Sequence, residues 1–277
     1  MAKTPQAALS FMRGIVPPAR QRVLNEQAEI QNVIDGEQGG YTVQAWDWMF
    51  YAEQVRREKY ALDEAQLKPY FALNTVLQEG VFWTANQLFG ITFVERFDIP
   101  VYHPDVRVWE IFDSDGVGMA LFYGDFFARD SKSGGAWMGN FVEQSTLNET
   151  RPVIYNVCNY QKPVDGQPAL LLWDDVITLF HEFGHTLHGL FAVQRYATLS
   201  GTNTPRDFVE FPSQINEHWA SHPRVFERYA RHVDSGEKMP ADLQEKMRKA
   251  SLFNKGYDMT ELLGAALLDM RWHMLEE

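Results

Sequence analysis

Residues 173–191 read WDDVITLFHEFGHTLHGLF, and this stretch decides how the chain arranges its most reactive side chains. Its apolar residues recur at helical spacing on both sides of a His-Glu-Phe-Gly-His segment, which predicts a buried helix. Asp174 or Asp175 is the expected N-cap, and both favour the positive end of the helix dipole. Gly184 costs about 1 kcal/mol relative to Ala inside such a helix. We therefore expect it to let backbone or substrate approach closely.

Three side chains of this helix predict a metal site. Positions four apart share one face of a helix, so His181 and His185 can present two imidazole nitrogens to a single ion. Glu182 projects beside that ion, where it can act as a general base toward water. This pattern is typical of zinc peptidases, which place two ligands and a base on one helix. The alternative is a buried helix whose histidines only satisfy hydrogen bonds.

A third ligand is needed, and His188 is the first candidate because it follows His185 by three residues. All three rings then lie on one face. With a rise of about 1.5 Å per residue, however, His188 lies ~10 Å along the axis from His181. A metal between the first two rings would leave His188 about one turn too far away.

Glu210 is the better candidate, because it lies on a second predicted helix. Thr204 is the expected N-cap of that helix and Pro205 the expected first residue. Two His and one Glu form a known catalytic zinc set that leaves the fourth position for water. We expect Pro212 to kink or interrupt the helix just afterwards. The alternative for Glu210 is a solvated surface charge, which its apolar neighbours at 208, 209 and 211 disfavour.

Two further polar residues follow on the same helix. Gln214 and Glu217 are candidates for hydrogen bonds to the metal ligands, which orient such ligands and tune their basicity. Surface roles for both residues remain the alternative.

These segments resemble a known family. HEFGHTLHGLF at 181–191 and DFVEFPSQ at 207–214 are similar to the thimet oligopeptidase family of zinc metallopeptidases, and Glu210 follows His181 by 29 residues, as the glutamate ligand does in that family. The resemblance covers nearly the whole chain. It includes LFYGD at 121–125, RDSKSGGAW at 129–137 and VCNY at 157–160.

The resemblance implies both a site and an activity. It implies one Zn²⁺ per chain, with His181, His185 and Glu210 as ligands and Glu182 as the catalytic acid–base residue. His188 is kept as an alternative ligand or a neighbour of the ligands. Within the family, the chain is most similar to bacterial peptidyl-dipeptidases, which release dipeptides from the C-terminus of oligopeptides. The alternative within the same family is an endopeptidase that cleaves oligopeptides internally.

The sequence departs from the family in one respect. Family members are longer and carry, beyond the metal helices, a Gly/Tyr-rich segment whose His and Tyr side chains are implied to stabilise the oxyanion. No such segment is found here, so we expect the chain to be the central part of a catalytic domain. It is then either an inactive zinc-binding fragment or a peptidase whose missing donors are replaced, with Tyr123 and Tyr257 as candidates.

Composition restricts the partners. The 277 residues include 37 Asp and Glu against 25 Lys and Arg, and the net charge of −12 disfavours nucleic acid and anionic membranes. The single cysteine, Cys158, excludes an internal disulfide framework, and its apolar surroundings indicate a buried strand residue. No apolar stretch approaches membrane-spanning length, and the N-terminus has no hydrophobic signal core. We expect a cytoplasmic monomer that acts on oligopeptides.

The hydrophobic pattern predicts one continuous domain over residues 1–277. It is mainly α, with a small antiparallel sheet beside the active site, and forms part of a zincin-like catalytic core. Residues 1–90 are helical, residues 91–160 form the sheet, and residues 161–277 contain the zinc-binding helices. Helices are expected at 5–12, 17–34, 46–60, 74–89, 213–221, 241–253 and 259–276, and strands at 106–112, 118–127 and 152–160.

The Gly-rich stretch at 131–135 is either an ordinary connector or a flap that faces substrate, and the family resemblance favours the flap. A sheet edge beside the metal would let a peptide bind as an added strand, so that its backbone is recognised more than its side chains. Such recognition suits a protease of broad specificity.

Overall fold

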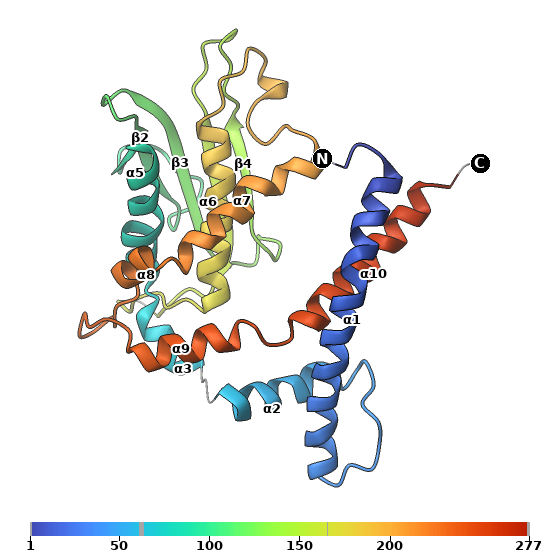
Figure 1. The fold of residues 1–277 in the computed structure, drawn as a ribbon. Helices are drawn as coiled ribbons and strands as arrows, with labels where there is room; N and C mark the ends of the chain where they lie inside the picture. The colour runs from blue at the N-terminus through green and yellow to red at the C-terminus, as the bar shows by residue number, and fades with distance from the viewer. Residues whose placement is uncertain (1, 61–63, 165, 276–277) are drawn as a thin grey trace. The chain divides into compact units, whose positions relative to one another are not determined.

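The computed structural model describes residues 2–60, 64–164 and 166–275. The chain divides into two compact units. Unit 1 combines Met1–Asp63 with Pro240–Glu277, and unit 2 is Glu64–Met239. Figure 1 shows the helices and strands of both units. The single continuous domain remains a prediction, and each unit is described by itself.

Unit 2 is built on a five-stranded sheet of order β1-β2-β3-β5-β4. Strands β1 and β2, β2 and β3, and β4 and β5 pair antiparallel, whereas β3 and β5 pair parallel. The strands are β1 (Thr92–Glu95), β2 (Arg107–Phe112), β3 (Gly118–Phe127), β4 (Trp137–Val142) and β5 (Val153–Tyr160).

The prediction of a mainly helical chain with a small sheet is confirmed. The prediction that this sheet is antiparallel was wrong, because β3 and β5 pair parallel. A strand's periodicity shows which residues share a face, and it carries no information about which strand lies beside it. Strands β1 and β4 were not predicted. Both are end strands of the sheet, with partly exposed residues in place of a long apolar run.

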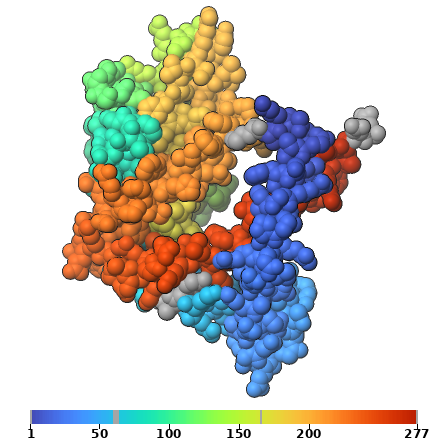
Figure 2. Space-filling view, in the orientation of Figure 1, coloured from blue at the N-terminus to red at the C-terminus, as the bar shows by residue number. Residues whose placement is uncertain are grey.

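Two helices lie on one face of the sheet in successive layers. Helix α6 (Trp173–Leu190) packs on β4 and β5, and α7 (Arg206–Ala220) packs on α6. Figure 1 shows α6 between the strands and α7. In Figure 2 the orange surface of α7 faces the viewer and lies in front of part of the yellow α6. This layering buries the helix that was predicted to carry the metal ligands.

Two glycines of α6 allow this close packing. A Cβ on Gly184 would lie 2.6 Å from Ser213 Cα and 2.9 Å from the Pro212 carbonyl oxygen, so the α7 backbone occupies that space. A Cβ on Gly189 would lie 2.8 Å from Ile154 Cδ1 of β5. The close approach expected at Gly184 is therefore made by backbone.

Both helix starts differ from the prediction by one to three residues. Helix α6 begins at Trp173 with Leu172 as its N-cap, and the Leu172 amide donates to Asp175 Oδ2 at 2.9 Å. Helix α7 begins at Arg206 with Pro205 as its N-cap, so Thr204 lies outside it. Asp175, the third residue of the helix, accepts a hydrogen bond from the backbone amide of the N-cap residue, so an acidic side chain can satisfy a free amide without being the N-cap itself.

Of the kink or interruption expected at Pro212, the interruption is absent, since α7 continues through Pro212 to Ala220, and the kink stays a prediction. A proline removes only one backbone hydrogen bond. Packing of the buried Ser213 and Asn216 against α6 supports the helix directly after that position.

Shorter helices complete unit 2 around an aromatic core. The π-helical segment η2 (Val76–Phe82) places Phe82 against Phe93, Phe122 and Phe183, with ring centroids 4.0–6.2 Å apart. Cys158 is buried in β5, as predicted. The other helices of this unit are α3 (Glu64–Leu67), η1 (Lys68–Tyr70), α4 (Leu73–Thr75), α5 (Trp83–Phe89), η3 (Ala197–Leu199) and α8 (Pro223–Tyr229).

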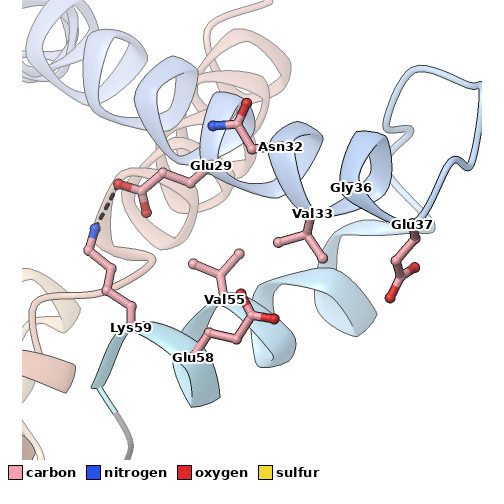
Figure 3. Close-up of a pocket in the computed structure, with 8 residues that line it drawn as sticks. All are labelled: Glu29, Asn32, Val33, Gly36, Glu37, Val55, Glu58 and Lys59. Atoms are coloured by element: carbon pink, nitrogen blue, oxygen red, sulfur yellow. Dashed lines mark hydrogen bonds and ion pairs between the residues drawn. The ribbon is translucent and has the colours of Figure 1, made fainter.

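In the described part of unit 1, the helices are α1 (Pro5–Gly36), α2 (Trp48–Tyr60), α9 (Ala241–Ala250) and α10 (Lys255–His273). Two helices were predicted at 5–12 and 17–34, but α1 is continuous, with Pro17 and Pro18 inside it. Figure 3 shows a groove between α1 and α2 where Lys59 pairs with Glu29 at 2.7 Å.

Residues far apart in the sequence join α1 to α10. The buried Glu26 carboxylate of α1 accepts the amides of Gly256 at 3.0 Å and Tyr257 at 2.9 Å, which are free groups of the first turn of α10. A Cβ on Gly256 would lie 2.5 Å from the Val23 nitrogen, so glycine permits this contact.

Within the described residues, no helix has both the length and the apolar character to cross a membrane.

Candidate metal centre

The structure brings together three of the side chains that the sequence singled out. His181 Nε2 lies 3.2 Å and His185 Nε2 lies 3.1 Å from Glu210 Oε2. The two histidines project from α6 and the glutamate from α7. Among the described residues, these three form the one cluster of metal-binding side chains whose ligand atoms all lie within 4.8 Å of one another.

The spacing of these atoms fits a small divalent metal. Bonds of about 2.0–2.1 Å in a tetrahedral site place neighbouring ligand atoms about 3.3 Å apart. The two measured N···O distances of 3.2 and 3.1 Å are close to this value. Two neutral imidazoles and one carboxylate are also a donor set that zinc prefers. The three residues therefore fit a zinc ion with one position open.

Glu182 lies beside this cluster in a different environment. Its side chain is buried, with 5% of its surface exposed, and its Oε2 atom has no hydrogen-bond partner among the described residues. Burial raises the pKa of Glu182 to about 7, and Glu210 adds to the rise while His181 opposes it. A buried carboxyl group with a free oxygen facing a cavity is suited to proton transfer.

Glu217, one of the two candidates for a supporting role, contacts a cluster residue. Its Oε1 atom lies 2.6 Å from His181 Nδ1. When the Nε2 atom binds a metal, Nδ1 carries the proton and donates it to the carboxylate, which fixes the orientation of the ring. Gln214, the other candidate, is exposed. The hydrogen bond to a predicted ligand that was expected from Gln214 is made by Ser213 instead. The Ser213 Oγ atom donates to Glu210 Oε2 at 2.8 Å.

Further polar side chains hold α6 in place by its backbone. Asn216 of α7 donates to the Phe180 carbonyl at 2.6 Å, and Asn156 of β5 donates to the Glu182 carbonyl at 3.1 Å. Both amides are buried. They fix the helix from opposite sides, immediately before and at the HExxH segment. Sequence reasoning missed them, and their only signal is an amide in an otherwise apolar buried run.

His188 lies apart from the cluster. Its ring packs against Phe208, with centroids 6.1 Å apart, and its Nδ1 atom is buried without a partner among the described residues. Burial lowers the pKa of His188. Among the described residues, His188 is not part of the cluster whose ligand atoms lie within 4.8 Å of one another.

We expect His188→Ala to leave zinc affinity unchanged, because Glu210 is the predicted third ligand and its Oε2 atom lies close to both His181 and His185. Zinc affinity would be measured by competition with a chromogenic chelator, with His185→Ala as the matched variant that loses the metal. A tenfold or greater loss in His188→Ala would contradict this ligand set.

Glu217→Gln is expected to weaken zinc binding by about 10- to 100-fold, the usual effect of losing a carboxylate behind a ligating histidine. The amide keeps the shape of the side chain but lacks the charge that favours the proton on Nδ1. The control is Gln214→Ala, three residues earlier on the exposed part of α7. Equal zinc affinities in the two variants would show that the contact does not support the site.

The cluster opens into a cavity of about 370 Å³. Glu182 and the three cluster residues form one wall, and Thr202 and Val209 contribute from the α6–α7 connection and from α7. Residues 136–138, where β4 begins, form the other wall. The end strand of the sheet is thus part of the same cavity as the predicted metal ligands.

Comparison with known proteins agrees with this geometry. The pattern that describes peptidase family M3 matches residues 1–277. The chain belongs to peptidase family M3. A dipeptidyl carboxypeptidase of Escherichia coli (strain K12) is 83% identical over 277 residues, which cover 100% of this chain and 41% of that protein. Oligopeptidase A of the same organism is 37% identical over 277 residues, covering 99% and 41% respectively. The chain thus spans about two fifths of the length of these relatives.

The two tyrosines considered as oxyanion donors in this family M3 chain lie in different units. Tyr123 of β3 donates to the Pro100 carbonyl at 3.4 Å. Its neighbour Phe122 contacts Phe183 of α6, so Tyr123 points to the opposite face of the sheet. Tyr257 lies in unit 1, where its ring stacks on Trp48 with centroids 4.7 Å apart. Tyr123 is therefore excluded as a donor toward the cluster.

Proposed function

We propose that this chain carries the zinc centre of a metallopeptidase that hydrolyses peptide bonds and releases dipeptides from the C-terminus of oligopeptides. The observation that carries the proposal is the convergence of His181 Nε2, His185 Nε2 and Glu210 Oε2 on one point, beside a buried Glu182 with a free oxygen. Release of dipeptides is supported by the 83% identity to a protein named dipeptidyl carboxypeptidase.

In this proposal, His181, His185 and Glu210 hold one zinc ion. Zinc supplies Lewis-acid chemistry, since it polarises a carbonyl and lowers the pKa of water. Glu182 accepts a proton from the attacking water and returns it to the departing amine. Burial keeps the Glu182 side chain in place without a competing hydrogen bond. Glu217 orients His181 through Nδ1.

The substrate peptide is proposed to bind along β4. This strand ends the sheet, so one of its edges has no neighbouring strand among the described residues, and its first residues line the cavity beside Glu182. An extended peptide can add to such an edge through backbone hydrogen bonds. Backbone recognition supports action on many sequences.

The test incubates the zinc-loaded chain with an N-blocked tetrapeptide and identifies the products by mass spectrometry. We expect release of the C-terminal dipeptide and no release in the presence of a zinc chelator. The same peptide with an amidated C-terminus serves as the control, because recognition of a free carboxylate is what separates release of dipeptides from internal cleavage.

Two outcomes would redirect the proposal. Internal cleavage of long peptides, with no preference for the C-terminal dipeptide, would favour the oligopeptidase alternative, which the 37% identity to Oligopeptidase A supports. No cleavage with one bound zinc per chain would favour a zinc-binding chain without turnover.

A further inference from the structure

A buried polar network lies on the face of the sheet away from α6. Asp125 of β3 is 1% exposed at its side chain and accepts two hydrogen bonds from Arg129, both at 2.7 Å, and one from Tyr102 at 3.0 Å. Lys132 is 4% exposed, and its ammonium lies 3.3 Å from Asp125 Oδ1. Burial raises the pKa of Asp125, but the bonds from Arg129, Tyr102 and Lys132 outweigh this effect and lower it overall. None of these groups lines the metal cavity.

Lys132 joins the loop to two strands at once. Its Nζ donates to the Phe127 carbonyl at 2.8 Å, to the Asp125 carbonyl at 3.2 Å and to the Cys158 carbonyl of β5. These carbonyls lie where β3 and β5 change register between Asp125 and Phe127. One buried ammonium therefore satisfies backbone groups at an irregular point of the sheet.

A second side chain holds the other half of the same loop. Asn159 of β5 donates through Nδ2 to the Ser133 carbonyl at 2.8 Å and to the Gly135 carbonyl at 2.7 Å. The loop contains Gly134 and Gly135, and neither would bring a Cβ within 4 Å of another atom. Glycines outside a packed contact make a loop costly to order. The hydrogen bonds from Lys132 and Asn159 therefore order it.

The loop leads directly into the metal cavity. Residue 136 follows Gly135, and residues 136–138 line the same cavity as Glu182 and the three cluster residues. A displacement of the loop moves the start of β4 relative to these side chains. A peptide that adds to the edge of β4 through backbone hydrogen bonds depends on the position of that edge, so the displacement weakens peptide binding.

We propose that Lys132 is a positioning residue: together with Asp125 and Asn159 it fixes the loop at 131–135 and so sets the start of β4 against the metal centre, where the substrate peptide binds. The peptide-binding part rests on the proposed function, whereas the ordering of the loop does not. The loop is thus a fixed support of the binding edge and not a mobile flap.

The test uses Lys132→Met, which keeps the length of the side chain and removes its donors, and Asn159→Ala, which lies near the surface and leaves the buried charges intact. The control is Lys162→Met, a lysine that follows β5 and pairs with Asp105 at the surface. Hydrogen exchange followed by mass spectrometry reports the amides of residues 131–138 and those of α6. Peptide binding is measured by calorimetry with the N-blocked tetrapeptide and the zinc-loaded chain in a Glu182→Gln background, where the peptide stays intact.

In both variants we expect exchange at 131–138 to rise at least about tenfold while exchange in α6 stays at the wild-type rate. Zinc content is expected to stay at one per chain. Peptide binding is expected to weaken about tenfold, and in the active chain the KM to rise by a similar factor with kcat within about twofold. Lys162→Met is expected to match the wild type in all of these measurements.

Wild-type exchange at 131–138 in both variants would overturn the proposal, whether or not the chain hydrolyses peptides. Raised exchange with unchanged peptide binding would also overturn it, since the network would then order the loop without setting the binding edge. If the wild-type chain neither binds nor cleaves the tetrapeptide, the proposed function is contradicted. The hydrogen-exchange rates of residues 131–138 then support or overturn the positioning role of Lys132 by themselves. If Lys132→Met fails to fold, Asn159→Ala decides the same outcomes.

Discussion

Glu182→Gln is expected to lower kcat/KM for peptide hydrolysis by about 10²- to 10⁴-fold, the range that general acid–base catalysis contributes. The amide has the shape of the carboxyl group but cannot accept the proton from water. Because Glu182 Oε2 has no partner among the described residues, the substitution breaks no hydrogen bond of the fold at that atom. The measurement is steady-state hydrolysis of the tetrapeptide, with zinc content determined on the same sample.

Zinc content separates the role of Glu182 from that of a ligand. We expect the variant to retain one zinc per chain, because the three predicted ligand atoms are unchanged. The matched control is Glu227→Gln, a surface glutamate of α8 that pairs with Lys238. Loss of zinc in Glu182→Gln, or wild-type turnover in a zinc-loaded sample, would contradict the assignment of the base.

Gly184→Ala is expected to weaken zinc binding at least tenfold and to lower the free energy of unfolding by about 1–3 kcal/mol, the usual cost of overpacking a core. The new Cβ would lie 2.6 Å from Ser213 Cα and 2.8 Å from Asn216 Cβ, both on α7. Backbone cannot move aside as a flexible side chain can, so α7 must shift as a whole. That shift carries Glu210 away from the two histidines.

The control for this variant is Gly14→Ala. Gly14 also lies inside a helix, α1, and a Cβ there would have no atom within 4 Å. Alanine is favoured over glycine in a helix interior by up to about 1 kcal/mol, so this variant is expected to be as stable as the wild type or more so. Chelator competition and urea unfolding give the two quantities. If Gly184→Ala binds zinc as tightly as Gly14→Ala does, α6 and α7 are not held at a fixed distance.

Much of the fold followed from periodicity. The helical spacing around His181 predicted α6, and the alternating or apolar runs predicted β2, β3 and β5. Strand β4 was not predicted, because its burial alternates weakly at the edge of the sheet. Pro17 and Pro18 were interpreted as the start of a new helix, yet α1 continues through them. Local signals for breaks were overridden where neighbouring turns are held by tertiary packing.

Part of the candidate site was likewise predicted from the sequence, and part of it was revealed only by the structure. His181 and His185 lie four positions apart on one helix, so helix geometry alone predicts that they share a face, with Glu182 beside them. Glu210 lies on the next long helix, and its prediction as the third metal ligand depended on the signals for the start of that helix and on the family resemblance. The contact of Glu217 with His181 was one of two open alternatives, and the structure distinguished it from the exposed Gln214.

The sequence by itself indicated the pair of histidines, the helix that carries them and the family to which they belong, and it predicted Glu182 as the base. Only the tertiary structure decided that Glu210 Oε2 lies within 3.2 Å of both imidazoles, that Asn216 and Asn156 donate to carbonyls of α6, and that Lys132 donates to the Cys158 carbonyl of β5. The reason is range: a helical period relates residues a few positions apart, whereas these contacts join residues 25 to 36 positions apart. Their distances are set by close packing at Gly184 and by buried hydrogen bonds, which no local pattern records.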